Sequence, residues 1–313
     1  MFGRLLNFTM YNQQGIPLTI VREGDPNALI CTVKIECMPN KEMTSAVVTV
    51  ENLDASLRRV IKEGQYKYVR IAFGYQDLGG TDTIFDGTLY RMITNRPQAE
   101  TSETMFYCYE LGDVYRQGWF SGTVPAGKSY YDGFKMVAEQ GSVKVPMQIA
   151  NELKNRIRSK DKSYYGSKMD ILNEMVEELP GYMLMHTMGQ VYIMSQEERE
   201  NSEIIVMTSY DEKGKIVSSS GLINIPTLED TGLSFECLVN SKLRIYSTVL
   251  IANSLIGNAQ EGFVRSSEAG AEYDSNGLYV VIKISATITN GPGNCSMKCR
   301  ALSRDYYIYG ALE

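Results

Sequence analysis

The apolar residues of this chain follow different periods along its length, and this change constrains the fold more than any other feature. Residues 1–118 and 208–313 are rich in β-branched and aromatic residues that partly alternate with polar ones, whereas residues 119–207 place apolar residues at helical spacing. Alternation predicts half-buried strands, and recurrence every three to four residues predicts helices. We therefore predict a mainly β chain with an α+β insertion in its middle.

The first stretch, 1–118, predicts a small barrel or sandwich with one helix. Residues 54–64 are expected to be helical because Asp54 is a candidate N-cap, Gly64 is a candidate stop, and apolar residues between them share one face. The expected strands, bounded by turn signals, are 18–21, 28–37, 44–51, 68–75, 83–89 and 104–111.

The middle stretch, 119–207, predicts a compact α+β unit. Residues 182–194 predict a hairpin that turns near Gly189. The expected helices, the last of which is stopped by a Pro-Gly pair, are 129–138, 146–154 and 167–179.

The last stretch, 208–313, returns to strands. Residues 290–293 read Asn-Gly-Pro-Gly and predict the turn of a final hairpin, while Gly262–Asn276 is rich in Gly, Ser and charge and predicts a mobile loop. No repeat of fixed period is visible, yet the β–α/β–β order indicates two related β units flanking an insert. The expected strands are 221–227, 233–238, 247–252, 278–289 and 295–302.

Length and charge limit the classes of function. At roughly 100–200 residues per domain, 313 residues predict two or three domains, which we place at 1–118, 119–207 and 208–313. The net charge is −6, so the chain lacks the basic footprint of a protein that binds specific DNA sequences. Mild acidity is compatible with a surface past which DNA slides without being retained.

The sequence also limits the compartment. No stretch approaches the roughly 20 apolar residues of a membrane-spanning helix, and the apolar start at residues 1–8 is too short, and the residues after it too polar, for a signal peptide. Six cysteines among 313 residues are too few for a disulfide scaffold. We expect synthesis in a cytoplasm, reduced thiols and no stable insertion into a membrane.

No catalytic constellation is visible in the sequence. The single histidine, His186, lies in an apolar hairpin without a nucleophile, a carboxylate or further metal ligands beside it, and is interpreted as structural or half-exposed. Cys295 and Cys299 would stand about 13 Å apart on one strand, which is too far to share a metal ion or a disulfide. We interpret both as small buried hydrophobic residues.

Two charged features allow a functional interpretation beside a structural one. Glu177 and Glu178 suggest a glycosidase pair, but adjacent helix positions diverge by about 100°, so a solvated helix face is favoured. The basic run 154–162, followed by two tyrosines, suggests a grip on nucleic acid, but helix-end charges or a protein contact are favoured. We therefore predict no catalytic, cofactor-binding or metal-binding residue, and no enzyme.

The aromatic composition is unusual. The chain contains 21 tyrosines and 16 methionines but one tryptophan, Trp119. Tyrosine suits large half-polar interfaces because its ring is buried while its hydroxyl keeps a hydrogen bond. We therefore favour large interfaces, over random drift in composition, as the explanation of the many tyrosines.

Short motifs in the two β stretches occur in a fixed order. Residues 221–226 read Gly-hydrophobic-x-x-x-Pro, 234–243 read x-Phe-x-Cys-Leu-hydrophobic-Asn-x-x-Leu, and 277–283 read Gly-x-Tyr-hydrophobic-Val-x-Lys. Together they resemble the second barrel of the baseplate hub proteins of tailed bacteriophages. Residues 50–53 and 84–89 are similar to the first barrel of that family, where Phe-x-Gly-x-Ile is common. The middle insert matches least.

This resemblance implies a fold and a structural role. Hub proteins of this kind carry two tail-tube-like β-barrels per chain, here flanking a small α/β domain, and three chains form a ring of six barrels. Such a ring links a hexameric tail tube to a trimeric spike and lets DNA pass, without cofactor or catalysis. The implied partners, in the baseplate of a virion or of a tail-derived injection device, are further copies of the chain, the tail tube protein, the spike or tail-tip protein, baseplate wedge proteins and the tape measure protein.

The regions most expected to form interfaces are the Phe73–Thr83 and Gly262–Asn276 loops. The main alternative is a hexameric distal tail or tube-initiator protein, which belongs to the same kind of assembly. A cell-wall hydrolase on a β scaffold would need a carboxylate or metal constellation, which the sequence does not display. An unrelated β adhesin is a third possibility.

Overall fold

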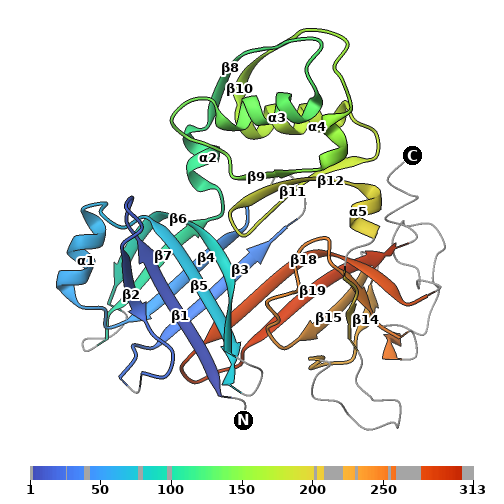
Figure 1. Cartoon of the computed structure of the whole chain (residues 1–313). Helices are drawn as coiled ribbons and strands as arrows, with labels where there is room; N and C mark the ends of the chain where they lie inside the picture. The colour runs from blue at the N-terminus through green and yellow to red at the C-terminus, as the bar shows by residue number, and fades with distance from the viewer. Residues whose placement is uncertain are drawn as a thin grey trace.

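The structure is mainly β, with one large, mainly antiparallel sheet beside a smaller unit of helices and short strands (Figure 1). Strands from both ends of the chain form the large sheet, and the middle of the chain forms the smaller unit. The computed structural model describes residues 3–25, 27–38, 43–76, 80–96, 101–200, 203–207, 221–229, 232–252, 255–258 and 276–304.

The first part of the chain forms a run of strands interrupted by a helix. These elements are β1 (Arg4–Tyr11), β2 (Pro17–Val21), β3 (Cys31–Cys37), β4 (Ser45–Glu51), α1 (Ala55–Lys62), β5 (Tyr68–Tyr75), β6 (Gly80–Asn95) and β7 (Glu103–Tyr109). Along the sheet their order is β3-β4-β7-β6-β5-β1-β2. Alternate residues along most of these strands are buried. Among them are Phe8 of β1 and Phe106 of β7, whose rings meet edge to face at 5.2 Å.

The last part of the chain forms the other half of the same sheet. Its strands are β13 (Ile205–Val206), β14 (Thr227–Glu229), β15 (Gly232–Cys237), β16 (Thr248–Leu250), β17 (Gly257–Asn258), β18 (Leu278–Thr289) and β19 (Ser296–Ser303). The order along this half is β17-β14-β15-β19-β18, with β16 paired to the start of β18. The two halves share one cluster of buried side chains, which runs from Leu6 to Ala301.

The two halves repeat one strand order. The series β3-β4-β7-β6-β5 corresponds to β14-β15-β19-β18-β16, and every neighbouring pair in both series is antiparallel. The long strands β6 and β18 even change register at matching places, between Leu89 and Arg91 against β7 and between Val281 and Lys283 against β19. The fold therefore contains an internal repeat.

An antiparallel ladder between β18 and β3 joins the two halves, and we call it the internal seam. It pairs Ile284 with Cys37 and continues to Thr289 opposite Thr32. The Ser285 hydroxyl donates across the internal seam to Glu36 Oε2 at 2.6 Å. Just beyond the ladder, Asn290 Nδ2 donates to the Leu29 carbonyl at 2.9 Å, and its Oδ1 accepts from the Cys31 N–H at 2.8 Å.

The middle of the chain builds a separate core. Its elements are α2 (Gly112–Gln117), β8 (Trp119–Val124), α3 (Tyr130–Glu139), β9 (Met147–Ile149), a 3₁₀ helix (Asn151–Lys154), β10 (Lys162–Ser167), α4 (Lys168–Glu177), β11 (Tyr182–Thr187), β12 (Gln190–Ser195) and α5 (Gln196–Glu200). Buried residues between Leu111 and Ile193 form this core. Lys168 is 1% exposed and ties α4 to α3, because its Nζ donates to the carbonyls of Ala138 (3.0 Å) and Val143 (2.7 Å).

Several predicted elements are confirmed. The helix begins after Asp54, whose carboxylate accepts from the Ser56 and Leu57 N–H groups. The predicted helices at 129–138 and 167–179 correspond to α3 and α4, and the two predicted hairpins correspond to β11–β12 and β18–β19. The prediction of a mainly β chain is likewise confirmed.

Other predictions are wrong. Residues 146–154 form β9 and a 3₁₀ helix instead of one helix, because β9 pairs in parallel with β12. The strand predicted at 221–227 starts only at Thr227, since Pro226 has no N–H for a ladder and Gly221 has a positive φ of 71°. The sequence patterns do not predict strand β1, helix α2 or the β8–β10 ribbon.

We expect Asn290→Ala to weaken the internal seam. The substitution removes two bonds to the β3 side and leaves a partly buried N–H and carbonyl without their partner, so the free energy of unfolding should fall by about 2 kcal/mol. Urea denaturation measures the loss. The matched control is Asn27→Ala, which changes an exposed asparagine and should leave stability within about 0.5 kcal/mol of the wild type. Equal stability of both variants would contradict the prediction.

Candidate assembly surfaces

One of the two predicted interface regions lies against the other half of the same chain. Phe73–Thr83 spans the end of β5 and the start of β6, with residues 77–79 outside the description. Tyr75 Oη accepts from the Val239 N–H at 3.3 Å, and the Ser241 hydroxyl donates to Asp82 at 2.7 Å. Gly262–Asn276 lies outside the described residues except for Asn276.

A buried carboxyl, Glu110, lies where the two halves of the sheet and the middle unit meet. It follows β7, is 3% exposed, and its Oε1 accepts from the Met188 N–H at 3.0 Å. Met188 and Gly189 form the two-residue turn between β11 and β12, and both have positive φ, as a tight hairpin turn requires. From the second half of the sheet, Arg244 reaches the Thr83 carbonyl at 3.1 Å. We call this meeting point the three-way junction.

The three-way junction shifts the pKa values of its charged groups, Glu110 and Arg244. Burial raises the pKa of Glu110 to about 7, although the Met188 N–H, Arg244 and Thr44 all favour its charged form. Asp86, the other facing acid, raises the pKa of Glu110 further. Burial also lowers the pKa of Arg244, against the pull of Glu110. Glu110 therefore changes charge near neutral pH.

We expect Glu110→Gln to stabilise the chain at alkaline pH. A raised pKa in the folded state means that the folded chain binds the extra proton between about pH 4.5 and 7, so the contribution of Glu110 to stability falls as pH rises through this window. The loss is on the order of 3 kcal/mol above pH 7. Glutamine keeps the acceptor for Met188 without the buried charge, so the variant should exceed the wild type at pH 8 and equal it near pH 4.

Urea denaturation at both pH values tests this expectation. Glu177→Gln, which neutralises an exposed carboxylate on α4, is the matched control and should change little at either pH. A Glu110→Gln variant that is less stable than the wild type at pH 8 would show that attraction to Arg244 outweighs the cost of burial.

The basic run 154–162 is engaged within the chain. Four of its five cations lie over tyrosine rings of the same unit, which favours the structural interpretation over a grip on nucleic acid. Arg158 is buried, and its guanidinium also lies 3.4 Å from Glu178. The distances from cation to ring centre are 4.9 Å for Lys154–Tyr131, 5.0 Å for Arg156–Tyr182, 4.8 Å for Arg158–Tyr130 and 5.0 Å for Lys162–Tyr164.

The two glutamates of α4 have different surroundings. Glu177 is exposed, as predicted, but Glu178 is half-buried and pairs with Arg158 and Lys162. The prediction of a solvated face is therefore wrong for Glu178. It is held by cations from the preceding loop and β10, which helical geometry alone cannot reveal.

The β8–β10 ribbon exposes an aromatic pair. Trp119 is 55% and Tyr165 79% exposed, and their rings meet edge to face at 5.2 Å. They lie on the outer face of the ribbon, while Phe120 and Tyr164 on its inner face are buried. Exposed apolar rings of this kind are more typical of contact surfaces than of solvated ones.

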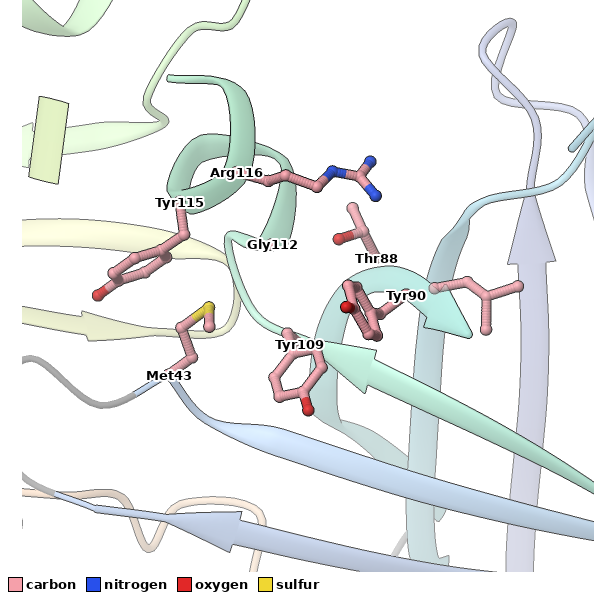
Figure 2. A pocket seen from close by; sticks show the side chains of 8 residues that line it. Met43, Thr88, Tyr90, Tyr109, Gly112, Tyr115 and Arg116 are labelled. Atoms are coloured by element: carbon pink, nitrogen blue, oxygen red, sulfur yellow. The ribbon is translucent and has the colours of Figure 1, made fainter. Parts of the chain in front are cut away.

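A shallow cavity of about 350 Å³ opens between β6, β7 and α2. Figure 2 shows Tyr90 and Tyr109 side by side on its floor and Arg116 extending above Thr88. The two tyrosine rings meet edge to face at 5.6 Å, and Tyr90 is 62% exposed. Arg116 is paired with Asp113 at 3.3 Å. The lining offers flat rings for a contact and no pairing of a nucleophile with a base.

The residues singled out for chemistry lie in structural settings. His186 is half-buried in β11, with its ring 6.2 Å from that of Tyr115. Cys295 and Cys299 are buried, and burial raises the pKa of Cys295. Across the described ranges, no group of three or more His, Cys, Asp or Glu residues could hold a metal ion. Nor does any helix in this part of the chain have the length and apolarity to cross a membrane.

No model of a protein family matches this sequence, and the comparison with curated proteins finds no match. Solved structures do match. The tail protein from Neisseria meningitidis MC58 has a TM-score of 0.57 at 9% identity, over 98% of each chain. The 43 kDa tail protein of prophage MuSo2 from Shewanella oneidensis has a TM-score of 0.56 at 7% identity, over 97% of this chain and 98% of that one.

A third structure adds a more particular likeness. The E. coli c3393 protein, a component of the type VI secretion system, has a TM-score of 0.53 at 6% identity, over 88% of this chain and 73% of that one. The chain thus has the fold of phage tail proteins. The E. coli c3393 protein is itself described as similar to the T4 bacteriophage tail proteins gp27 and gp5. The resemblance to hub-like tail proteins is therefore confirmed at the level of the fold.

Proposed function

We propose that this chain is the structural hub of a phage tail baseplate, or of a tail-derived injection device, and that three copies form a ring. The observation that carries this proposal is the internal repeat, whose two halves are joined edge to edge at the internal seam. Three such chains, meeting head to tail, would present six equivalent units. A ring of this kind can meet a hexameric tube on one side and a trimeric spike on the other.

The finer architecture belongs to the same proposal. Each half of the sheet would close into a tail-tube-like β-barrel, with a small α/β domain inserted between them. We keep the domain boundaries at 1–118, 119–207 and 208–313. The separate core of the middle unit supports the inserted domain, and the repeated strand order supports two related barrels.

The proposed location is the tail baseplate of the virion, after assembly in the host cytoplasm. The partners would be the tail tube protein, the spike or tail-tip protein, baseplate wedge proteins and the tape measure protein. The tail proteins and the type VI secretion component that share the fold support this setting. DNA would pass through the bore without being retained, which a net charge of −6 favours.

The role proposed is structural, without catalysis. The candidate residues for chemistry pack within the fold, and the solved structures of like fold are described as tail or secretion components. A distal tail or tube-initiator protein is the second candidate, because it too would form rings of tail-like barrels. The two halves per chain favour the hub, since a hexamer of this chain would contain twelve related units.

We expect native mass spectrometry of the purified full chain to give a particle of three times 35.1 kDa. Light scattering across a range of concentrations provides the independent check. A hexamer would favour the distal tail ring instead. A monomer at every concentration would contradict a self-assembling ring, and activity on cell walls in a zymogram would contradict the non-enzymatic role.

A further inference from the structure

The internal seam predicts which strands join one copy to the next. We propose that β6 of one copy pairs antiparallel with β14 of the adjacent copy, in the register that β18 adopts with β3 inside the chain. This inference rests on the proposed ring and names its subunit interface. It follows from the repeat, because β6 corresponds to β18 and β14 corresponds to β3.

The register follows from two equivalent ladders, β6 with β7 in the first half and β18 with β19 in the second. Thr94 lies opposite Thr104 of β7, and Ala286 lies opposite Met297 of β19, each three residues after the matching change of register. Thr94 and Ala286 are therefore equivalent positions. At the internal seam Ala286 faces Ile35.

The other strand of the seam is aligned in the same way. In the first half, Ile35 pairs with Ala46 of β4, and Ala46 pairs with Cys108 of β7. In the second half, Leu228 pairs with Leu233 of β15, and Leu233 pairs with Ala301 of β19. Cys108 and Ala301 are equivalent in turn, because they lie opposite Leu89 and Val281. Ile35 therefore corresponds to Leu228, so Thr94 should face Leu228 of the partner subunit.

The second half of β6 is an edge suited to such pairing. Among the described residues, β5 pairs with β6 only as far as Thr88, and the remainder to Asn95 pairs with β7 alone. This leaves one side of a strand rich in β-branched and aromatic residues without a ladder. The edge begins at the exposed Tyr90 and includes the half-buried Ile93 and Thr94.

The internal seam supports a second copy as the occupant. Inside the chain the equivalent edge of β18 is covered by β3, and β3 corresponds to β14. Another copy of the chain therefore carries the strand that fits this edge. In the proposed register Glu229 of the partner subunit lies opposite Ile93, on the face of the sheet away from Thr94.

Strand β14 is not bare in the single chain. The two-residue strand β17 lies along its outer side, where Gly257 N–H donates to the Pro226 carbonyl at 2.8 Å. Pairing with β6 of another copy therefore requires β17 to leave this position. A two-residue parallel contact is a weak competitor for a longer antiparallel ladder, so β17 protects the edge before assembly without preventing it.

Cysteine cross-linking in the full chain tests the proposed interface. Thr94→Cys with Leu228→Cys places thiols on directly facing residues of two copies, whereas the matched control, Thr94→Cys with Glu229→Cys, moves one thiol to the other face of the sheet. The native cysteines are buried or half-buried. Burial raises the pKa of Cys37, the half-buried one, to about 12, so it stays protonated at pH 8.

Mild oxidation followed by a non-reducing gel should give a covalent trimer for the first pair, at about tenfold higher yield than for the control. A second pair, Asn95→Cys with Thr227→Cys, is predicted to cross-link as well and replaces the first if that variant does not fold. Stronger cross-linking of the control would overturn the register. A native trimer in which no facing pair cross-links would overturn the interface and leave the ring intact. A chain that is monomeric at every concentration would overturn both.

Discussion

The antiparallel ladder between β18 and β3 is the interaction on which the rest of the structure depends. It joins two sets of strands that lie far apart in the sequence into one sheet, and their side chains then share one core. Without it, each set would expose a strand edge and part of its apolar face to water. The bonds from Asn290 to Leu29 and Cys31 continue the junction beyond the last ladder pair.

The middle unit is attached where this sheet is joined. Its β11–β12 hairpin contacts Glu110 through Met188, and Arg244 from the second half approaches the same carboxyl while holding the Thr83 carbonyl of the first. Three parts of the chain are thus linked by short polar contacts around one buried acid. A shift of either half relative to the other would strain the contacts that hold the hairpin, because these hydrogen bonds are directional.

The sequence predicts the elements that carry local signals and misses those set by distant contacts. Asp54 predicts the start of α1, and the Asn-Gly-Pro-Gly turn predicts the β18–β19 hairpin, because caps and turns depend on neighbouring residues. The order of the stretches indicates two related β units, but the sequence does not show which positions correspond. Equivalent positions such as Phe106 and Cys299 hold different residues, because a backbone ladder accepts either. The surroundings of Glu110 and Glu178 also escape prediction, since their partners come from other segments.

The position of Trp119 has a practical consequence. It is the one tryptophan of the chain, and it lies on the exposed face of β8, in the unit with its own core. Its fluorescence is therefore a natural reporter for the middle unit alone, whereas the large sheet contributes through tyrosine. Quenching of that emission by a dissolved quencher would show whether this face is covered in an assembled particle, without any label being added.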